Sequence, residues 1–163
     1  MNAQSVIYED EQKQLAEICQ RLLREALAKA IFLLDRNGQV IVSIGEISEI
    51  DVTSLASLVA GTTAATSSLA KLLGEPEFPV HFHEGKRDHL HISLAGEEFI
   101  LTVIFDQRSS LGLVRLRVKK TTERLQEAFV AMEERRRLPA PQGAGLFDEI
   151  TDDDIDNLFG DGF

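Results

Sequence analysis

Apolar residues recur at three- and four-residue steps near the start of the chain and predict a first helix from about Glu9 to Ala28. Its apolar face consists of Leu15, Ile18, Cys19, Leu22 and Ala26. The pattern then changes to two short apolar runs, Ala30–Asp35 and Gln39–Ile44, separated by Asn37-Gly38. An Asn-Gly pair between such runs is typical of a tight hairpin, because both central residues of the turn need positive φ.

A second, longer helix is predicted from Val52 to Leu73. Asp51 is a suitable N-cap, since its carboxylate can accept from the free amides of the first turn. Gly74 and Pro76 end the helix. We expect its core-facing stripe to consist of Leu55, Leu58, Val59, Thr62, Leu69 and Leu72.

Three further strands and a final helix complete the predicted order α-β-β-α-β-β-β-α. The strands are expected at Val80–Glu84, Asp88–Leu94 and Glu98–Phe105, and the helix runs from Ser109 or Ser110 to about Arg137. The inner side of this helix is predicted to carry Leu111, Val114, Val118, Leu125, Phe129 and Met132. Every strand joins the next by a hairpin except across the central helix. This predicts an α+β fold with one antiparallel five-stranded sheet covered by helices.

Composition changes sharply after the last helix. Residues 1–137 are expected to form one domain, 138–146 a Pro/Gly-rich flexible linker, and 147–163 an acidic tail. Seven of the 27 acidic residues lie in the tail, which has no Lys or Arg, so the body carries 20 acids against 17 bases. Such a distribution argues against nucleic acid or an anionic membrane as the main partner and favours a protein.

The sequence also indicates the cellular compartment of the protein. The N-terminus lacks a basic cluster followed by an apolar run, and no apolar stretch reaches the roughly 20 residues of a membrane span, so we expect a cytoplasmic protein. The single cysteine, Cys19, lies on the apolar face of the first helix and is interpreted as a buried small hydrophobe rather than a redox thiol.

Few residues of the sequence indicate catalysis, cofactor binding or metal binding. The sequence contains no phosphate-binding glycine motif, nucleophile elbow or cysteine metal pair, and we predict no catalytic residue and no cofactor. The four histidines fall in one predicted hairpin, and a three-residue loop, Gly85–Arg87, would place all of them on one face. They are the weak candidates for a Zn²⁺ or Ni²⁺ site, the alternative being a polar sheet face that happens to use histidine: His81, His83, His89 and His91.

Very small residues form a second stripe on the central helix. Ala56, Ala60, Ala64 and Ser68 follow at four-residue steps, flanked by Ser57, Gly61, Ser67 and Lys71. A face exposed only to water usually carries long polar residues, whereas small side chains let another backbone approach closely. The stripe therefore indicates a protein interface, or packing against another element of the same fold.

The acidic tail contains a second candidate interface. Thr151 with Asp154 resembles a capping box, and the apolar residues that follow have helical spacing. We interpret the segment either as a short amphipathic docking motif or as a solubilising tail. The apolar residues of this motif are Ile150, Ile155, Leu158 and Phe159.

Three segments, AIFLLDRNGQVIVSIG, DVTSLASLVAGTTAATSSLAKLLGE and FDQRSSLGLVRLRVKK, resemble the Roadblock/LC7 family. The likeness is greatest to bacterial members that regulate a Ras-like small GTPase of the MglA type in gliding motility and cell polarity. It implies a five-stranded antiparallel sheet with helices on both faces. It also implies a homodimer in which the central helices build a platform for the GTPase, with higher oligomers left open.

The resemblance further implies GTPase activation without an inserted catalytic residue: the regulator reorients the GTPase's own catalytic groups. The implied protein is cytoplasmic and concentrated at a cell pole. The expected GTPase-binding residues are Ala60, Ala64, Ser67, Ser68 and Lys71. The expected dimer residues are Ala56, Ser57 and Gly61. Two alternatives remain open, a scaffold that does not activate and a metal-binding protein that uses the histidine hairpin.

Overall fold

The structure is a computed structural model in which residues 6–138 are described. The chain separates into two units, Met1–Val130 and Ala131–Phe163, and each is described by itself. The predicted order of elements, α-β-β-α-β-β-β-α, is confirmed. Of the predicted linker and tail, all but Leu138 lie outside the described residues, so the domain boundaries stay predictions.

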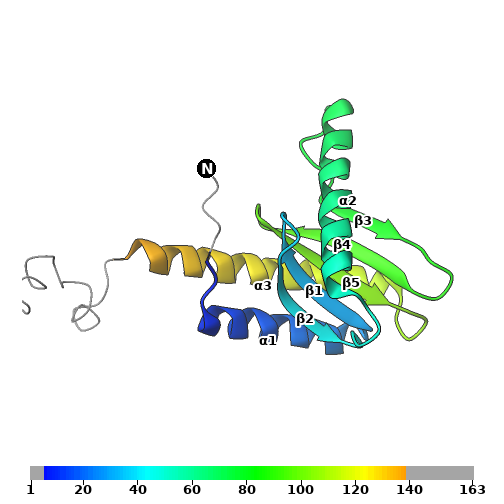
Figure 1. The fold of residues 1–163 in the computed structure, drawn as a ribbon, viewed down its shortest axis with the longest axis horizontal. Helices are drawn as coiled ribbons and strands as arrows, with labels where there is room; N and C mark the ends of the chain where they lie inside the picture. Colours follow the sequence, from blue (N-terminus) through cyan, green and yellow to red (C-terminus); the bar gives the residue numbers. More distant parts are fainter. Residues whose placement is uncertain (1–5, 139–163) are drawn as a thin grey trace, which may run out of the picture. The chain divides into compact units, whose positions relative to one another are not determined.

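Five strands form one antiparallel sheet in the order β2-β1-β5-β4-β3 (Figure 1). The strands are β1 (Ala30–Asp35), β2 (Val40–Gly45), β3 (Val80–His83), β4 (His89–Ala95) and β5 (Phe99–Phe105). The central strand β5 is buried along its whole length. The predicted hairpin is present, but its turn differs from the prediction: Gly38 has φ +88°, whereas Asn37 does not adopt positive φ. The Asp35 carboxylate accepts from the backbone amides of Asn37 and Gln39, both at 2.9 Å.

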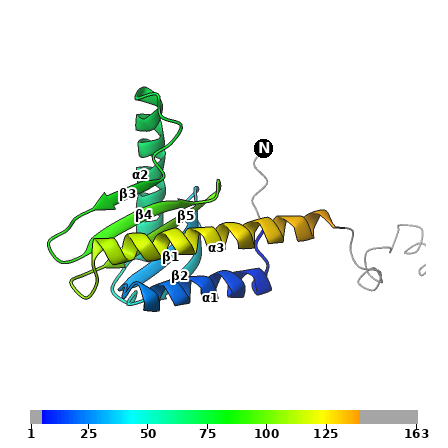
Figure 2. The ribbon, with the colours of Figure 1, turned by 180° about the vertical axis from the view of Figure 1, so that it is seen from behind.

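Helices cover both faces of the sheet. Helix α2 (Val52–Leu72) lies on one face, while α1 (Glu9–Glu25) and the part of α3 (Leu111–Arg137) up to residue 130 lie on the other (Figures 1 and 2). The α2 side of the core is one cluster of apolar side chains. It contains Ala30, Phe32, Leu34, Ile92, Ile100 and Ile104 of the sheet with Ala56, Val59 and Ala60 of α2.

Helix α1 buries the predicted face, with Leu15, Cys19 and Leu22 fully covered. It ends at Glu25, three residues before the predicted end. The physical reason is Leu27, whose φ of +52° is left-handed and incompatible with further helix.

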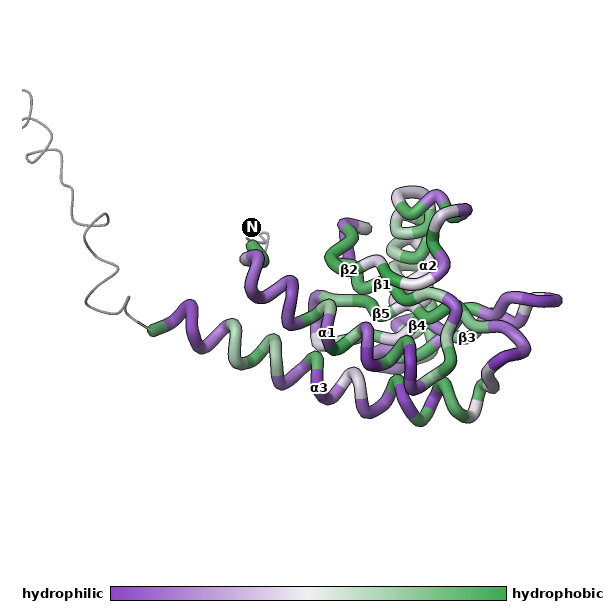
Figure 3. Tube along the Cα trace, turned by 90° about the horizontal axis from the view of Figure 1, so that it is seen from below, coloured by the Kyte–Doolittle hydropathy of each residue, from purple (hydrophilic) through white to green (hydrophobic). Residues whose placement is uncertain are grey.

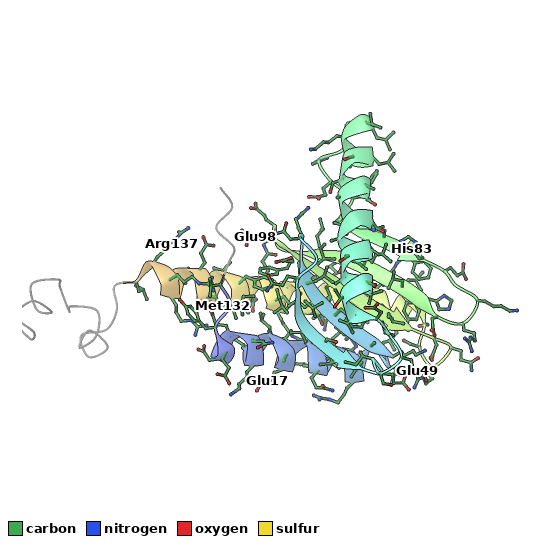
Figure 4. All side chains as sticks on the ribbon, viewed as in Figure 1. Glu17, Glu49, His83, Glu98, Met132 and Arg137 are labelled. Carbon is green, nitrogen blue, oxygen red and sulfur yellow. The ribbon has the colours of Figure 1, made fainter. Side chains whose placement is uncertain are left out.

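Helix α3 packs through Val114, Val118, Thr121, Leu125 and Ala128 within the first unit. The predicted inner residues Leu111 and Phe129 are only half-buried, although the Phe129 ring stacks on Phe99 at 4.3 Å between centroids. In the second unit the helix continues to Arg137, whose guanidinium pairs with Glu133 at 2.8 Å, and Met132 is buried (Figure 4).

Candidate functional site: the outer face of helix α2

Local signals at both ends of α2 act as predicted. The Asp51 carboxylate accepts from the Ser54 amide at 3.1 Å and from the Ser54 hydroxyl at 2.7 Å. These hydrogen bonds to the charged form lower the pKa of Asp51 below its usual value. The helix ends at Leu72, and Gly74 follows with φ +75° while the Glu75 amide donates to the Ala70 carbonyl at 2.9 Å.

The face that α2 turns toward the sheet differs from the prediction. The buried residues are Ala56, Val59, Ala60, Thr63 and Ala70. The helix therefore approaches the sheet through small side chains. The approach is close at the first hairpin, where a Cβ atom placed on Gly38 would lie 3.3 Å from the Ala56 carbonyl oxygen.

Three leucines predicted for the core stripe are instead exposed. Leu58 is 70% exposed, Leu69 50% and Leu72 83%. Their placement in the core stripe was wrong because α2 carries apolar or small residues on every side (Figure 3), so its sequence does not distinguish the covered face from the open one.

The exposed leucines and small residues together form what we term the outer face of α2: Leu58, Gly61, Ala64, Ala65, Ser68, Leu69 and Leu72. Leu58, Ala65 and Leu72 are spaced by seven residues and therefore line one side of the helix, away from the sheet. A continuous apolar strip of this kind on a helix marks an interaction surface. Its small residues allow a partner backbone to come close.

The predicted interface residues divide between the two faces. Ala56 and Ala60, 1% and 8% exposed, contribute to the core cluster, so their side chains are covered within the chain itself. Ser67 is half-buried and the others are exposed on or beside the outer face: Ser57, Gly61, Ala64, Ser68 and Lys71. The small-residue stripe thus packs internally at its start, while its later residues are exposed and their predicted role as an interface stays a prediction.

Sequence reasoning missed a polar network beside this surface. The Ser67 hydroxyl donates to Glu77 Oε1 at 2.8 Å, and both terminal nitrogens of Arg36 reach the same oxygen at 3.3 and 3.4 Å. Hydrogen bonds from Ser67 and Arg36 lower the pKa of Glu77, and the charges of Arg36 and Lys71 act in the same direction. Arg36 and Glu77 are 41 positions apart, so no local sequence signal could have paired them.

The four histidines do not share one face, contrary to the prediction. The pairing of β3 with β4 places His81 opposite Ile92 and His83 opposite Leu90. Opposed residues lie on the same face, so His81 and His83 lie on the α2 side while His89 and His91 lie on the other. The connection holds one more residue than predicted, which shifts the register and separates the set.

The division of the four histidines between two faces does not favour a shared metal site. Within residues 6–138, no group of three or more His, Cys, Asp or Glu side chains is arranged to hold a metal ion. His83 lies exposed at the end of β3 (Figure 4). His91 is 1% exposed, and its burial, with the charges of Arg115 and His81, lowers its pKa to about 4.

Cys19 is fully covered, and burial raises the pKa of its thiol to about 12. The prediction of a buried hydrophobe is confirmed. Across residues 6–138, no helix combines the length and apolar character that a membrane crossing requires. The docking motif predicted at Ile150, Ile155, Leu158 and Phe159 lies outside the described residues.

Comparison with known proteins defines the family to which this chain belongs. The family model for the Roadblock/LC7 domain matches residues 14–105, and the chain belongs to the Roadblock/LC7 family. No curated protein gives a significant match.

Within the family, the chain is similar to MglB. Myxococcus xanthus MglB is 52% identical over 77% of this chain and 95% of that chain, with a TM-score of 0.74. The gliding protein MglB of Thermus thermophilus is 35% identical over 78% and 97%, with a TM-score of 0.72. An MglB described in a tetrameric arrangement is 34% identical over 78% and 96%, with a TM-score of 0.73.

Proposed function

We propose that this protein is a homodimeric activator of a Ras-like small GTPase of the MglA type, and that it acts in bacterial motility and cell polarity. The observation that carries the proposal is the outer face of α2, an exposed strip of leucines and small residues on a chain 52% identical to MglB. The proposed role implies a cytoplasmic protein concentrated at a cell pole.

The outer face is long enough to serve two partners. We assign Ser57 and Gly61, near the start of α2, to the dimer contact, and Ala64, Ser68 and Lys71, further along, to the GTPase, with Ser67 at the inner edge of that surface. Ala56 and Ala60 support both contacts from beneath, because they hold the helix against the sheet. The tetrameric MglB relative is consistent with further association of such dimers.

Activation in this proposal needs no residue donated by the regulator. A partner that binds the catalytically competent conformation of the GTPase more tightly than the others raises its population. Shifting a two-state equilibrium from 1:99 to 99:1 takes about 5.5 kcal/mol of differential binding, within the range of a protein interface. Motility and polarity then follow from the lifetime of the GTP-bound state.

The proposal is tested by hydrolysis of GTP by an MglA-type GTPase under single-turnover conditions, with and without the full chain. The wild-type protein is expected to accelerate hydrolysis. In the double variant Ala64→Arg/Ser68→Arg, two unpaired charges and added volume enter the contact. About 1–3 kcal/mol of overpacking at each position weakens binding roughly ten- to a hundred-fold per site.

The matched control carries the same two arginines on exposed positions of the other helices, Gln20→Arg/Gln126→Arg, and should activate as the wild type does. Thermal melts of all proteins check that the fold is intact. Binding without acceleration by the wild-type chain would show a scaffold and refute activation. Normal activation by the Ala64/Ser68 variant would place the GTPase contact elsewhere.

A further inference from the structure

The outer half of α2 has little apolar contact to fix its direction. The residues of α2 in the core cluster are Ala56, Val59 and Ala60, with Val52 and Leu55 packed at its edge. Beyond Thr63 the only buried residue of the helix is Ala70, and the helix extends past the sheet (Figures 1 and 2). The interface also buries the hydroxyl oxygens of Thr63 and Thr102 with no hydrogen-bond partner among the described residues, which weakens it.

Beyond the apolar contact between α2 and the sheet, a series of polar contacts links the helix to Arg36. Ser67 on α2 donates to Glu77, which lies in the segment that returns from α2 to β3. Glu77 in turn accepts from Arg36, at the end of β1. Arg36 is itself held by the hairpin between β4 and β5. Its Nε donates to the Glu97 carbonyl, and its backbone amide donates to the Glu98 carbonyl at 3.2 Å.

The return segment is held at both ends as well. The Glu75 amide donates to the Ala70 carbonyl at 2.9 Å, and the Pro79 carbonyl accepts from the Leu94 amide of β4 at 2.9 Å. Glu77 lies between these two anchors and is the acceptor shared by Ser67 and Arg36. Its removal therefore takes away the side-chain link between the outer half of α2 and Arg36, while the backbone anchors at the ends of the segment stay in place.

We propose that Glu77 is a positioning residue for GTPase activation: with Arg36 and Ser67 it fixes the direction of the outer half of α2, and so the surface on which the GTPase docks. This inference rests on the proposed function. Leu72 lies 12 residues beyond Ala60, which is about 18 Å of helix, so a tilt of about 10° at Ala60 moves Leu72 by about 3 Å. Errors of about 1 Å in catalytic alignment can cost about a hundred-fold in rate.

A purely stabilising role for the network predicts a different result. Glu77 and Arg36 have side chains 34% and 36% exposed, and ion pairs of that exposure contribute about 0–1 kcal/mol to folding. The global stability of a Glu77 variant should therefore stay near that of the wild type. A large loss of activation with a small loss of stability distinguishes positioning from general support.

The experiment compares Glu77→Ala with Glu75→Ala in the full chain. Glu75 is an exposed glutamate two positions away in the same segment, and its anchoring contact uses the backbone amide, which alanine retains. We expect Glu77→Ala to lower the maximal GTPase rate at saturating protein about ten-fold or more, with a melting temperature within about 3 °C of the wild type. Glu75→Ala should match the wild type in both measurements.

Two further readouts report on position itself. Amide hydrogen exchange of residues 64–72 should accelerate in Glu77→Ala while residues 52–60 keep their protection. The charge swap Arg36→Glu/Glu77→Arg should recover part of the rate lost in each single variant, because it restores the ion pair.

The outcomes separate the two proposals. If the wild-type chain does not accelerate hydrolysis at all, the proposed function fails. If the wild type activates and Glu77→Ala activates equally well, the positioning role fails while the function stands. A fall of Glu77→Ala melting temperature by more than about 5 °C, with exchange accelerated throughout the fold, would show a structural role and also overturn the inference.

Discussion

His91 gives the sharpest prediction about the fold itself. It lies on β4 between Phe82 and Val103 of the neighbouring strands, is 1% exposed, and its Nδ1 has no hydrogen-bond partner among residues 6–138. Burial, and after it the charges of Arg115 and His81, lowers the pKa of the His91 side chain from 6.5 to about 4. The folded protein therefore keeps this imidazole neutral at pH values where the unfolded chain binds a proton.

The sign of the pH dependence follows from this difference. Between pH 6.5 and about 4 the unfolded state holds more protons at this site, so the free energy of unfolding falls as the pH falls. Each pKa unit corresponds to about 1.4 kcal/mol, and the contribution of His91 reaches at most about 3 kcal/mol at the acidic end of that window. As the pH rises past 6.5 the dependence fades, because the imidazole becomes neutral in the unfolded chain as well.

The variant His91→Phe removes the titrating group and keeps a ring of similar size. Urea unfolding at fixed protein concentration should give it a stability within about 1 kcal/mol of the wild type at pH 7.5. At pH 4.5 it should be more stable than the wild type by about 2–3 kcal/mol. His83→Phe, which places the same ring at an exposed position of the hairpin, is the control for the added aromatic side chain at pH 7.5. Equal pH profiles for His91→Phe and the wild type would refute the reasoning.

Two further predictions concern a sterically restricted glycine and the buried thiol. Gly45 has φ +95°, and an added Cβ would lie 2.4 Å from the Lys29 carbonyl oxygen, so Gly45→Ala should destabilise the fold by about 2–4 kcal/mol in urea unfolding. Gly112→Ala, with no atom within 4 Å of the added carbon, should not destabilise it, and equal losses would contradict the steric argument. Cys19, buried and with its pKa raised to about 12, should react with a thiol reagent only as fast as the protein opens. Rapid labelling of the native protein would show the thiol to be accessible.

Features set by a few neighbouring residues could be predicted from the sequence. The hairpin at Asn37-Gly38, the Asp51 cap and the Gly74 stop each depend on groups within about four residues, and all three are present, although the turn itself is not the predicted one. Alternation and turn positions also gave the number of strands and their order along the chain, and three of the four strand pairings follow from hairpins. Local patterns were therefore sufficient for the elements and the hairpins, whereas the pairing of β1 with β5 joins segments far apart in the sequence.

Features set by distant groups were not predictable in this way. The β3–β4 connection holds one more residue than predicted, which changes the face of two histidines, and its Asp88 pairs with Lys29, 59 positions away, at 3.1 Å. The pairing of Arg36 with Glu77 depends on where α2 and the return segment lie in space. Each outcome depends on tertiary packing, on which short sequence patterns carry little information.

The face of α2 that packs on the sheet, which the sequence did not predict correctly, determines which side chains are available for binding. Small residues let the helix lie close to the sheet, and three leucines, each 50–83% exposed, are left on the outer face. Burying a leucine contributes about 1.5–3 kcal/mol, so the three could contribute at most about 4–9 kcal/mol to association. Association itself costs about 4–15 kcal/mol, so the leucines alone cannot sustain a tight complex. We propose that close backbone packing against Gly61, Ala64, Ala65 and Ser68 supplies the remainder, so enlarging those residues should impair binding at least as much as losing a leucine.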